Sequence, residues 1–333
     1  MSNNQPKGDR AVIALPDNGI PKKKRHLMTF PVMAPKAPQA PIDRQRYTLS
    51  IVIPCYNESA TIAPLLARVA RADVPHMEVI VVDDGSTDGT TDLLGGDLSH
   101  AIDRLIVHRK NLGKGAALRS GFKEATGDII LVQDADLEYD PEDYRRLIQP
   151  ILERGADVVY GSRFAGSDGQ PVLSFWHVLA NRLLTLLSNC FTNLNLTDME
   201  TGYKVFRRDV IQAIALRENR FGFEPEVTAK LAKSGYVFHE VPIHYRGRSY
   251  AEGKKIGLKD AVRALYATVR YSLFPQLPAI GSLASRPPAP AGELISDREP
   301  RDGPDIPRVQ TATKPPLSPI ASAVEHGIES SVS

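Results

Sequence analysis

Short runs of branched apolar residues alternate with amphipathic stretches through the middle of the chain. The run Ile129–Val132 has no polar position, which is typical of a strand buried on both faces of a sheet. Other stretches repeat apolar residues at helical spacing, and one of them places Ile62, Leu65, Leu66 and Val69 on one face. We expect strands at Leu49–Pro54, Glu78–Asp83, Arg104–His108, Ile129–Val132 and Asp157–Ser162, and helices around 62–69, at Lys114–Ala125 and from Pro141. This alternation predicts an α/β fold, with a mostly parallel sheet flanked by helices on both faces.

Proline divides the chain into three parts. Residues 1–46 hold seven prolines and residues 275–333 hold eleven, out of 26 in the whole chain. Neither segment has hydrophobic periodicity, so we expect both to be largely disordered tails. Residues 47–274 remain as the folded domain, and they contain no internal repeat.

Composition and charge fit a soluble globular protein. Hydrophobic residues make up 42% of the chain and the formal net charge is only +2, so the overall charge does not argue for a nucleic-acid partner. The two cysteines, Cys55 and Cys190, do not make a disulfide framework and fit a reducing compartment. The amino terminus lacks the apolar segment of a signal peptide, so we expect a cytoplasmic protein.

Two carboxylates follow the apolar run Ile129–Val132, at the point where that strand should end. Asp134 and Asp136 are two residues apart, so in extended backbone both point to the same side. The carboxyl ends of strands are where open α/β sheets bind ligands. Neighbouring carboxylates repel each other, and a hard divalent cation relieves that repulsion and suits a diphosphate. A solvated acidic turn is the alternative, since Asp-x-Asp alone occurs in many unrelated loops.

Polar loops also follow the first two strands. The segments Pro54–Glu58 and Val82–Thr90 should lie at the same sheet edge as Asp134, where an aspartate can accept hydrogen bonds from a base or a ribose. The Asp, Ser and Gly residues of the second segment equally suit a tight turn followed by helix caps. A GxGxxG pattern starting at Gly113 has Leu118 in place of its third glycine, and no GxxxxGK[ST] loop occurs. We therefore expect neither a dinucleotide fold nor a P-loop.

Five motifs, in this order, resemble glycosyltransferases of family 2, which have the GT-A fold. They read Ile-Pro-Cys-Tyr-Asn-Glu (53–58), Val-Asp-Asp-Gly-Ser-Thr-Asp-Gly (82–89), Asn-Leu-Gly-Lys-Gly (111–115), Asp-Ala-Asp-Leu-Glu (134–138) and Gly-Ser-Arg-Phe (161–164). Within that family the chain is most similar to dolichyl-phosphate mannose synthases and related polyprenyl-phosphate glucosyltransferases. The resemblance covers residues 47–274 and implies a Rossmann-like sheet, with a nucleotide-sugar half at 47–165 and an acceptor half at 166–274.

The resemblance also implies roles for particular residues of the first half. The residues implied in nucleotide binding are Pro54, Tyr56, Glu58, Val81 and Asp83. The residues implied to face the diphosphate and a Mg²⁺ or Mn²⁺ ion are Asp134, Ala135 and Asp136, with Asp136 as a direct ligand. Glu138 stands where the mannose synthases often carry Gln, and its carboxylate is an equally hard metal ligand. Arg163 is implied to reach the donor.

Basic residues of the second half are implied as well. The segment Asp198–Lys204 resembles the family's Asp-x-x-Ser-Gly-Phe-Arg and puts Lys204 at the basic position, as a contact of the nucleotide sugar. A later loop of the family has an Arg and a Lys that clamp phosphate, here Arg248 and Lys255. This chain has one extra residue between them and lacks the usual Ser before the Lys, so Lys254 could take its place, and a solvated basic loop is the alternative. The set implied in catalysis is Asp134, Asp136, Arg248 and Lys255.

Two helical stretches of the second half bear on membrane contact. Val172–Leu196 is rich in apolar residues with Arg182 as its only charge, but polar residues interrupt it, so we do not expect it to span a bilayer. It is either a core helix, which the sequence alone favours, or a helix at the membrane surface. The stretch from Leu258 has an apolar stripe of Val262, Leu265, Val269 and Leu273. Between Tyr245 and Phe274 seven basic and two acidic residues give a net charge of +5, which suits either an anionic membrane or packing on the sheet with a solvated back. We therefore expect a protein that associates peripherally with the cytoplasmic face of a membrane.

The acceptor decides the chemistry that the resemblance implies. A polyprenyl or dolichyl phosphate has a second pKa near ~6 and is mostly dianionic at neutral pH, so it needs no strong general base. We expect an inverting transfer of mannose or glucose from GDP-mannose or UDP-glucose to such a lipid phosphate. A glycan hydroxyl as acceptor would instead need a carboxylate base such as Asp198 or Glu224. A third hypothesis is a protein that binds a nucleotide sugar without turnover, against which the intact pair Asp134 and Asp136 argues.

Overall fold

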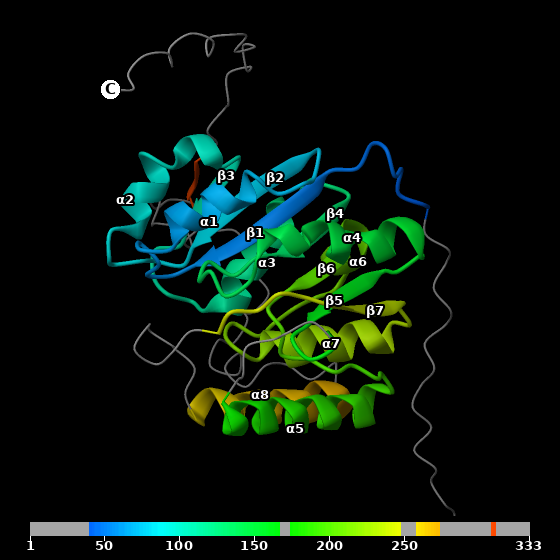
Figure 1. Ribbon diagram of the computed structural model, residues 1–333. Helices are drawn as coiled ribbons and strands as arrows, with labels where there is room; N and C mark the ends of the chain where they lie inside the picture. The colour runs from blue at the N-terminus through cyan, green and yellow to red at the C-terminus, as the bar shows by residue number, and fades with distance from the viewer. Residues whose placement is uncertain (1–39, 167–173, 248–257, 274–307, 311–333) are drawn as a thin grey trace, which may run out of the picture. The chain divides into compact units, whose positions relative to one another are not determined.

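The computed structural model describes residues 40–166, 174–247, 258–273 and 308–310 (Figure 1). Within these residues one sheet holds eight strands in the order β7-β5-β6-β4-β1-β2-β3-β8. The strands are β1 (Leu49–Cys55), β2 (Met77–Asp83), β3 (Arg104–Val107), β4 (Ile129–Val132), β5 (Val158–Ser162), β6 (Lys204–Arg207), β7 (Phe238–Pro242) and β8 (Arg308–Gln310). Four neighbouring pairs are parallel and three are antiparallel, so the predicted α/β fold with a mostly parallel sheet is confirmed.

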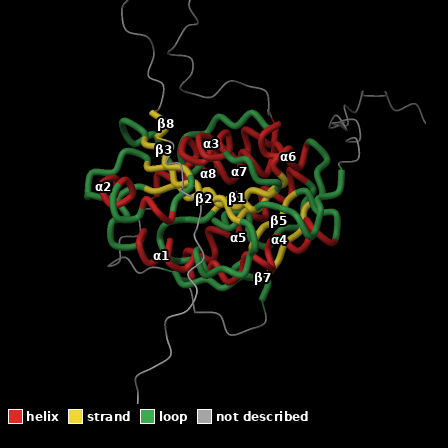
Figure 2. Tube along the Cα trace, turned by 90° about the horizontal axis from the view of Figure 1, so that it is seen from above, coloured by secondary structure: helices red, strands yellow, loops and turns green. Residues whose placement is uncertain are grey.

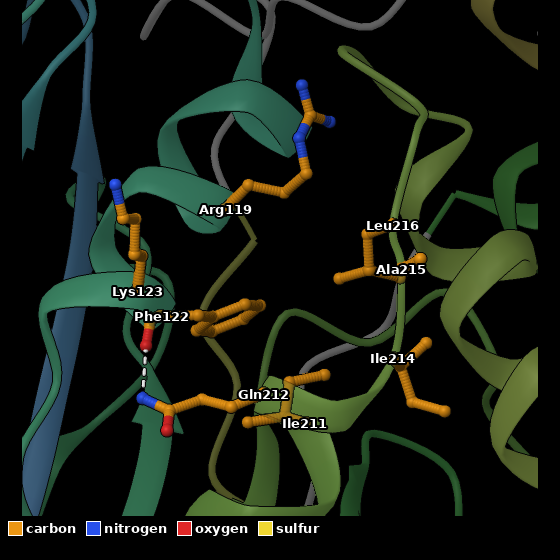
Figure 3. A pocket seen from close by; sticks show the side chains of 8 residues that line it. All are labelled: Arg119, Phe122, Lys123, Ile211, Gln212, Ile214, Ala215 and Leu216. Atoms are coloured by element: carbon orange, nitrogen blue, oxygen red, sulfur yellow. Dashed lines mark hydrogen bonds between the residues drawn. The ribbon is translucent and has the colours of Figure 1, made fainter.

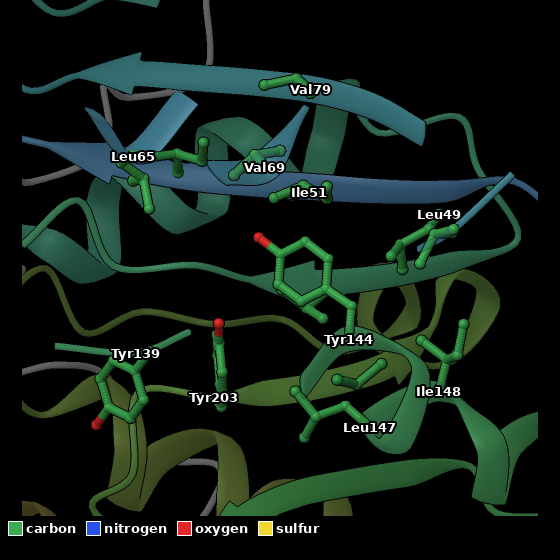
Figure 4. Packing of buried hydrophobic residues seen from close by; sticks show 14 of the residues in the cluster. Leu49, Ile51, Leu65, Val69, Val79, Tyr139, Tyr144, Leu147, Ile148 and Tyr203 are labelled. Carbon is green, nitrogen blue, oxygen red and sulfur yellow. The ribbon is translucent and has the colours of Figure 1, made fainter. Parts of the chain in front are cut away.

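Strand β1 lies between β2 and β4 and is parallel to both. It is buried on both faces, which explains why Ile51, Val52 and Ile53 form an apolar run without polar alternation. Ile51 and Ile53 pack into the hydrophobic cluster on one face of the sheet, part of which Figure 4 shows. Val52 packs into a second cluster on the opposite face. The five strands predicted from the sequence agree with the observed bounds to within one residue at each end.

Strand β6 was not expected from the sequence pattern. It comes from the second half of the domain and lies antiparallel between β4 and β5. It has only four residues, starts with the buried cation of Lys204 and ends with Arg207, so it offers no apolar period to recognise. Because β7 also pairs with β5, strands of both halves of the domain alternate in one sheet.

Helices cover both faces of the sheet (Figure 2). On one face α1 (Ile62–Val69) and α4 (Tyr144–Glu153) pack into the cluster of Figure 4, and the four predicted apolar positions of α1 are buried. On the other face α3 (Lys114–Glu124), α6 (Arg208–Ala213) and α7 (Phe223–Lys233) supply the second cluster. A short helix, α2 (Thr90–Gly95), follows β2, and a 3-10 turn at Pro141–Asp143 precedes α4.

Two long helices form a further layer. Helix α8 (Leu258–Leu273) packs mainly on α7 and on α5 (Phe175–Thr192), so the alternative in which it packs on the sheet is wrong (Figure 1). Its buried side chains include Ala264, Ala267 and Tyr271, whereas Leu265 from the predicted stripe is 47% exposed. The polar contact of the Tyr271 hydroxyl, which donates to Glu218 Oε1 at 2.8 Å, helps to choose this face, and hydrophobic periodicity does not reveal such a contact.

The proline-rich C-terminal stretch contributes one element to the described structure. Arg308–Gln310 forms β8 and pairs antiparallel with β3. The expectation that this stretch lacks regular structure therefore has an exception at these three residues. Residues 1–39, 274–307 and 311–333 lie outside the described residues.

One buried carboxylate fixes the connections among β2, β3 and α3. Asp84, directly after β2, lies 2.7 Å from Nδ1 of His108, which follows β3. The same carboxylate accepts hydrogen bonds from the backbone N–H groups of Leu112 (3.0 Å) and Gly113 (2.6 Å), just before α3. His108 Nε2 lies 2.9 Å from Ser120 Oγ on α3. No local pattern marks His108 in the sequence, because its partner is 24 residues away along the chain.

We predict that Asp84→Ala lowers the free energy of unfolding by at least about 2 kcal/mol, because several buried donors would lose their acceptor. Urea denaturation followed by circular dichroism measures this change. Asp97→Ala, at an exposed aspartate of the following loop, is the matched control and should change stability by less than about 0.5 kcal/mol. Equal, small effects of the two substitutions would contradict the anchoring role of Asp84.

Candidate active site

The loops after β1, β2 and β4 meet at one edge of the sheet. The parallel register pairs Cys55 with Asp83 and Val52 with Val132, so all three strands run out toward the same side. The Asp134 loop begins two residues after the end of β4. The predicted convergence of the polar loops at the carboxyl ends of neighbouring parallel strands is therefore confirmed.

Side-chain hydrogen bonds join the first two loops directly. The backbone N–H of Asn57 donates to Ser86 Oγ at 2.9 Å, and Asn57 Oδ1 accepts from the backbone N–H of Thr87 at 2.8 Å. The N–H of Glu58 donates to Thr90 Oγ1 at 3.1 Å. Asn57 has φ = 54°, in the left-handed region that asparagine tolerates better than most residues. The two loops thus form one unit over the ends of β1 and β2.

The residues implied in nucleotide binding lie on this unit. Those that are half-buried are Pro54, Tyr56 and Glu58, and those that are fully buried are Val81 and Asp83. The Val81 side chain packs in the core cluster on one face of the sheet. Asp83 accepts hydrogen bonds from the N–H (3.1 Å) and hydroxyl (2.5 Å) of Ser86, and from the hydroxyl of Thr91. The turn interpretation of this segment is confirmed for the Asp83 carboxylate, and its contact with a nucleotide stays a prediction.

Lys114 joins two carboxylates at the centre of the site. Its Nζ lies 2.8 Å from Oδ1 and 3.0 Å from Oδ2 of Asp134, and 3.3 Å from Oε1 of Glu224. Burial would lower the pKa of Lys114, but Asp134 and then Glu224 raise it above its ordinary value, so the ammonium stays charged. Gly202 lies against Asp134, and a side chain at this position would overlap the Asp134 carboxylate. Lys114 is part of a motif in the sequence, but no role could be predicted for it, because its two partners come from other parts of the chain.

The loop after Asp134 carries the other carboxylates implied in metal binding. Ala135 is buried, Asp136 and Glu138 are half-buried, and Leu137 between them has φ = 62°. Glu138 Oε2 accepts a hydrogen bond from the Tyr245 hydroxyl at 2.9 Å. Within the described ranges, no three His, Cys, Asp or Glu side chains converge into a metal-binding group. The donor set still fits Mg²⁺ or Mn²⁺ bound together with a diphosphate, because Mg²⁺ typically takes one or two carboxylates plus phosphate oxygens and water.

Arg163 is buried beside Asp198, which satisfies much of its hydrogen-bonding capacity. Its Nε and Nη2 each donate to Asp198 at 2.7 Å, and Asn181 Nδ2 donates to the same carboxylate at 3.1 Å. Burial would raise the pKa of Asp198, but Arg163 and these hydrogen bonds hold it below its ordinary value. Such a carboxylate is poorly suited to accept a proton, so the alternative in which Asp198 is a general base loses support. The implied contact of Arg163 with the donor stays a prediction.

Lys204 points into the protein interior, in the neighbourhood of Glu200. It is almost fully buried, and its Nζ donates to the backbone carbonyls of Met199 (3.0 Å) and Thr201 and lies 4.5 Å from the centroid of the Tyr160 ring. Burial lowers the pKa of Lys204 to about 8. Glu200 has an enclosed Oε1 with no hydrogen-bond partner in the described ranges, and burial together with nearby Glu224 raises its pKa to about 8. Nothing in the sequence shows that Glu200 is enclosed, so it was not among the predicted residues.

Two further predicted residues, Arg248 and Lys255, lie outside the described residues, as does the alternative Lys254. Their implied role in binding phosphate therefore stays a prediction.

A cavity of about 440 Å³ lies elsewhere, between α3 and the segment around α6 (Figure 3). Its apolar wall includes Phe122, Ile211 and Leu216, and Arg119 lies at its rim. The amide of Gln212 crosses its lower side and donates to the carbonyl of Phe122 at 2.7 Å. None of the residues predicted for the site lines this cavity.

The raised pKa of Glu200 predicts a pH-dependent stability. An unfolded Glu titrates near 4.5, and folded Glu200 near about 8, so over pH 5–7.5 the folded state binds one more proton than the unfolded state. Stability from this group is fully present below about pH 4.5 and is lost as the pH rises through about 8. The free energy of unfolding of Glu200→Gln, taken relative to that of the original protein, should therefore rise by about 1 kcal/mol or more between pH 5 and pH 7.5.

Urea denaturation at several pH values measures this difference, with Glu142→Gln at an exposed glutamate as the control. A difference that stays constant over this pH range would show that Glu200 is ionised in the folded protein.

Comparisons with known proteins place this site in a family. A family description, "Glycosyl transferase family 2", matches residues 50–215. An undecaprenyl-phosphate mannosyltransferase of Micrococcus luteus is 32% identical over 213 residues, which are 62% of this chain and 86% of that protein. An undecaprenyl-phosphate 4-deoxy-4-formamido-L-arabinose transferase of Aeromonas hydrophila is 30% identical over 226 residues. That match spans 66% of each protein, so the chain covers just under two thirds of the length of this relative.

Solved structures share the fold. Glucosyl-3-phosphoglycerate synthase of Mycobacterium tuberculosis, in complex with Mn²⁺, uridine diphosphate and glucosyl-3-phosphoglycerate, superposes with a TM-score of 0.53 and 22% identity, over 71% of this chain and 82% of that one. Mannosyl-3-phosphoglycerate synthase of Rubrobacter xylanophilus gives a TM-score of 0.52 at 21% identity, over 73% and 79% of the two chains. The fold, the five motifs and the sequence relatives agree, and the chain belongs to the glycosyltransferases of family 2.

Proposed function

We propose that this protein transfers a hexose from a nucleotide sugar to a polyprenyl phosphate, with inversion and with the help of Mg²⁺ or Mn²⁺. The observation that carries the proposal is the convergence of the nucleotide loops, Pro54–Glu58 and Asp83–Thr90, with the acidic loop Asp134–Glu138 at one sheet edge. Such an edge suits a nucleoside diphosphate, whose base and ribose face the first loops and whose phosphates face the carboxylates.

The relatives support the choice of acceptor more than the choice of sugar. The names of the Micrococcus and Aeromonas proteins differ in the sugar, mannose against a modified arabinose, but both contain undecaprenyl phosphate. We therefore assign a polyprenyl phosphate as acceptor and keep mannose from GDP-mannose and glucose from UDP-glucose as the two candidate donors. An M. tuberculosis structural neighbour is recorded with Mn²⁺ and uridine diphosphate, which supports a divalent ion as part of a GT-A donor site.

The residues of the chain have separate tasks in this mechanism. Asp136, Glu138 and Asp134 would hold the metal ion, which when bound neutralises charge on the leaving nucleoside diphosphate. The buried Arg163–Asp198 pair keeps the neighbouring loops in place and leaves no proton acceptor at Asp198. A lipid phosphate needs none, because its dianion is already a nucleophile at neutral pH. We expect Arg248 and Lys255 to hold the phosphate groups of donor and acceptor close to each other.

One observation favours a second candidate function, transfer to a glycan hydroxyl. Glu224 is buried, and its Oε2 has no hydrogen-bond partner among the described residues, although Oε1 lies near Lys114. A carboxylate in this state could accept the proton of a hydroxyl acceptor. Glu224→Gln distinguishes the two functions, because it should reduce transfer to a hydroxyl by about 10²–10⁴ and transfer to a lipid phosphate far less.

Helix α5 supports contact with a membrane surface. Its polar residues Asn181, Thr185 and Ser188 are buried, whereas Trp176 is 75% exposed and Leu183 is 58% exposed. The prediction of a core helix is therefore wrong for these apolar residues, because hydrogen bonds of Asn181 and Thr185 to the segment around Asp198 turn the polar side inward. The full set of large exposed apolar residues on α5 is Phe175, Trp176, Leu179, Leu183 and Leu186.

None of the helices in the described residues is long and apolar enough to cross a bilayer. We propose that α5 lies at the surface of the membrane that holds the lipid acceptor.

An assay of the purified protein tests the function. Incubation with radiolabelled GDP-mannose or UDP-glucose, polyprenyl phosphate and Mg²⁺ or Mn²⁺ should give a labelled, solvent-extractable lipid, and EDTA should stop the reaction. Asp136→Asn should lower turnover by at least about 10²-fold while leaving the fold intact, because it removes a metal ligand at a strand end. Asp140→Asn is the control, since Asn can still accept the helix-capping hydrogen bond that Asp140 accepts from Glu142.

Full activity in EDTA, or in Asp136→Asn, would refute the metal site. Labelled product only in glycan, together with loss of activity in Glu224→Gln, would replace the lipid phosphate by a hydroxyl acceptor.

Flotation with anionic vesicles at low salt tests the membrane surface. The double variant Trp176→Ser/Leu183→Ser should bind vesicles at least about tenfold more weakly, because each buried apolar side chain typically contributes about 1.5–3 kcal/mol. Val237→Ser changes an apolar residue away from α5 that is 48% exposed, and this variant should bind like the original protein. Equal flotation of all three proteins would contradict a role of α5.

A further inference from the structure

The start of α3 is packed in a way that fixes the position of Lys114. Gly113, with φ = 104°, and Gly115 lie so close to the backbone of Glu218 and Asn219 that a side chain at either glycine would overlap it. The N–H of Ala116 donates to the carbonyl of Asn219 at 3.0 Å. Lys114 lies between these two glycines, and its side chain is thereby directed toward the acidic centre of the site.

The ammonium of Lys114 occupies both oxygens of Asp134. The distances are 2.8 Å to Oδ1 and 3.0 Å to Oδ2, and the third carboxylate oxygen within reach is Oε1 of Glu224 at 3.3 Å. All three side chains are mostly shielded from solvent, so the ion pair is stronger than a surface pair. The Lys114 ammonium is therefore shared by two carboxylates, and within the described part of the chain Glu224 Oε2 has no hydrogen-bond partner.

We propose that Lys114 is a placeholder cation at Asp134. A divalent metal ion must displace the Lys114 ammonium from this carboxylate, and the ammonium then binds the donor diphosphate. This proposal rests on the proposed function, because it takes Asp134 as part of the metal site. A carboxylate cannot give both oxygens to an ammonium and also bind a metal ion at full strength, so the two cations compete. A diphosphate next to the site offers Lys114 a new anionic partner and so lowers the cost of its displacement.

Metal and nucleotide binding should consequently be coupled through Lys114. Coupling of this kind is reciprocal, so the nucleotide raises the affinity for the metal by the same factor as the metal raises the affinity for the nucleotide. Lys114 is a positioning residue in this scheme. It moves between Asp134 and the diphosphate and takes no part in making or breaking a bond.

Titration of the full-length protein with Mn²⁺, followed by the electron paramagnetic resonance signal of free Mn²⁺, measures the competition. Lys114→Met should bind Mn²⁺ without nucleotide about tenfold or more tightly than the original protein, which is the size of one charge-assisted contact. The increase in Mn²⁺ affinity on adding UDP or GDP should be correspondingly smaller in this variant. Lys114→Arg keeps the charge and should restore both values toward those of the original protein.

Lys230→Met is the matched control, because Lys230 pairs with the buried Glu226 at 2.6 Å on α7 and touches neither Asp134 nor Glu224 in the described contacts. It should leave Mn²⁺ binding unchanged. Lys114→Gln provides a second neutral variant, in case Lys114→Met does not fold.

Several outcomes would overturn the proposal. Unchanged or weaker Mn²⁺ binding by a folded Lys114→Met or Lys114→Gln protein would refute the placeholder alone, provided that the original protein binds Mn²⁺ with UDP or GDP. Independent binding of Mn²⁺ and nucleotide to the original protein would refute the coupling. No Mn²⁺ binding by the original protein even with nucleotide would refute the metal site of the proposed function, and the placeholder with it.

Discussion

The arrangement of this site depends on a single buried carboxylate, Asp84. It holds the chain at the end of β2, the imidazole of His108 after β3 and the backbone before α3. These hydrogen bonds satisfy donors that a tight loop would otherwise bury without a partner. They also set where α3 begins, and thus where Lys114 meets Asp134. A hydrogen-bond network outside the candidate active site therefore fixes the geometry of the charged residues within that site.

The second structural constraint is the way in which the two halves of the domain share a sheet. Strand β6 lies between β4 and β5, so the segment just before it is held beside the acidic loop. That segment supplies Asp198, which binds Arg163 from the end of β5, and Gly202, which lies against Asp134. One sheet and the Arg163–Asp198 ion pair thus hold the segment before β6 beside the loops of the first half of the domain.

Most of the fold could be predicted from the sequence, because strand and helix periods are local properties. The same holds for the edge where the loops of Asp83 and Asp134 meet, since parallel strands end on the same side. The partners of charged residues could not be predicted in this way. Lys114 and Arg163 were recognisable as motif residues, yet their partners come from segments far away along the chain. Lys204 was recognisable in the same way, but its inward turn onto the carbonyls of its own segment does not show in the sequence. Hydrophobic patterns also misjudged α5 and α8, because buried hydrogen bonds rather than apolar stripes decide which sides face inward.

Helix α5 has a further consequence, for how the stability of this protein should be understood. Its inward side is polar and its outward side carries Trp176, Leu183 and Leu186. On the proposed membrane contact, a bilayer that covers the outward side binds the folded arrangement of these residues, which unfolding disperses. By mass action such binding shifts the unfolding equilibrium, by about 2.7 kcal/mol when the ligand is at a hundred times its Kd. On the same proposal, the melting temperature of this domain would be higher with lipid than in plain buffer.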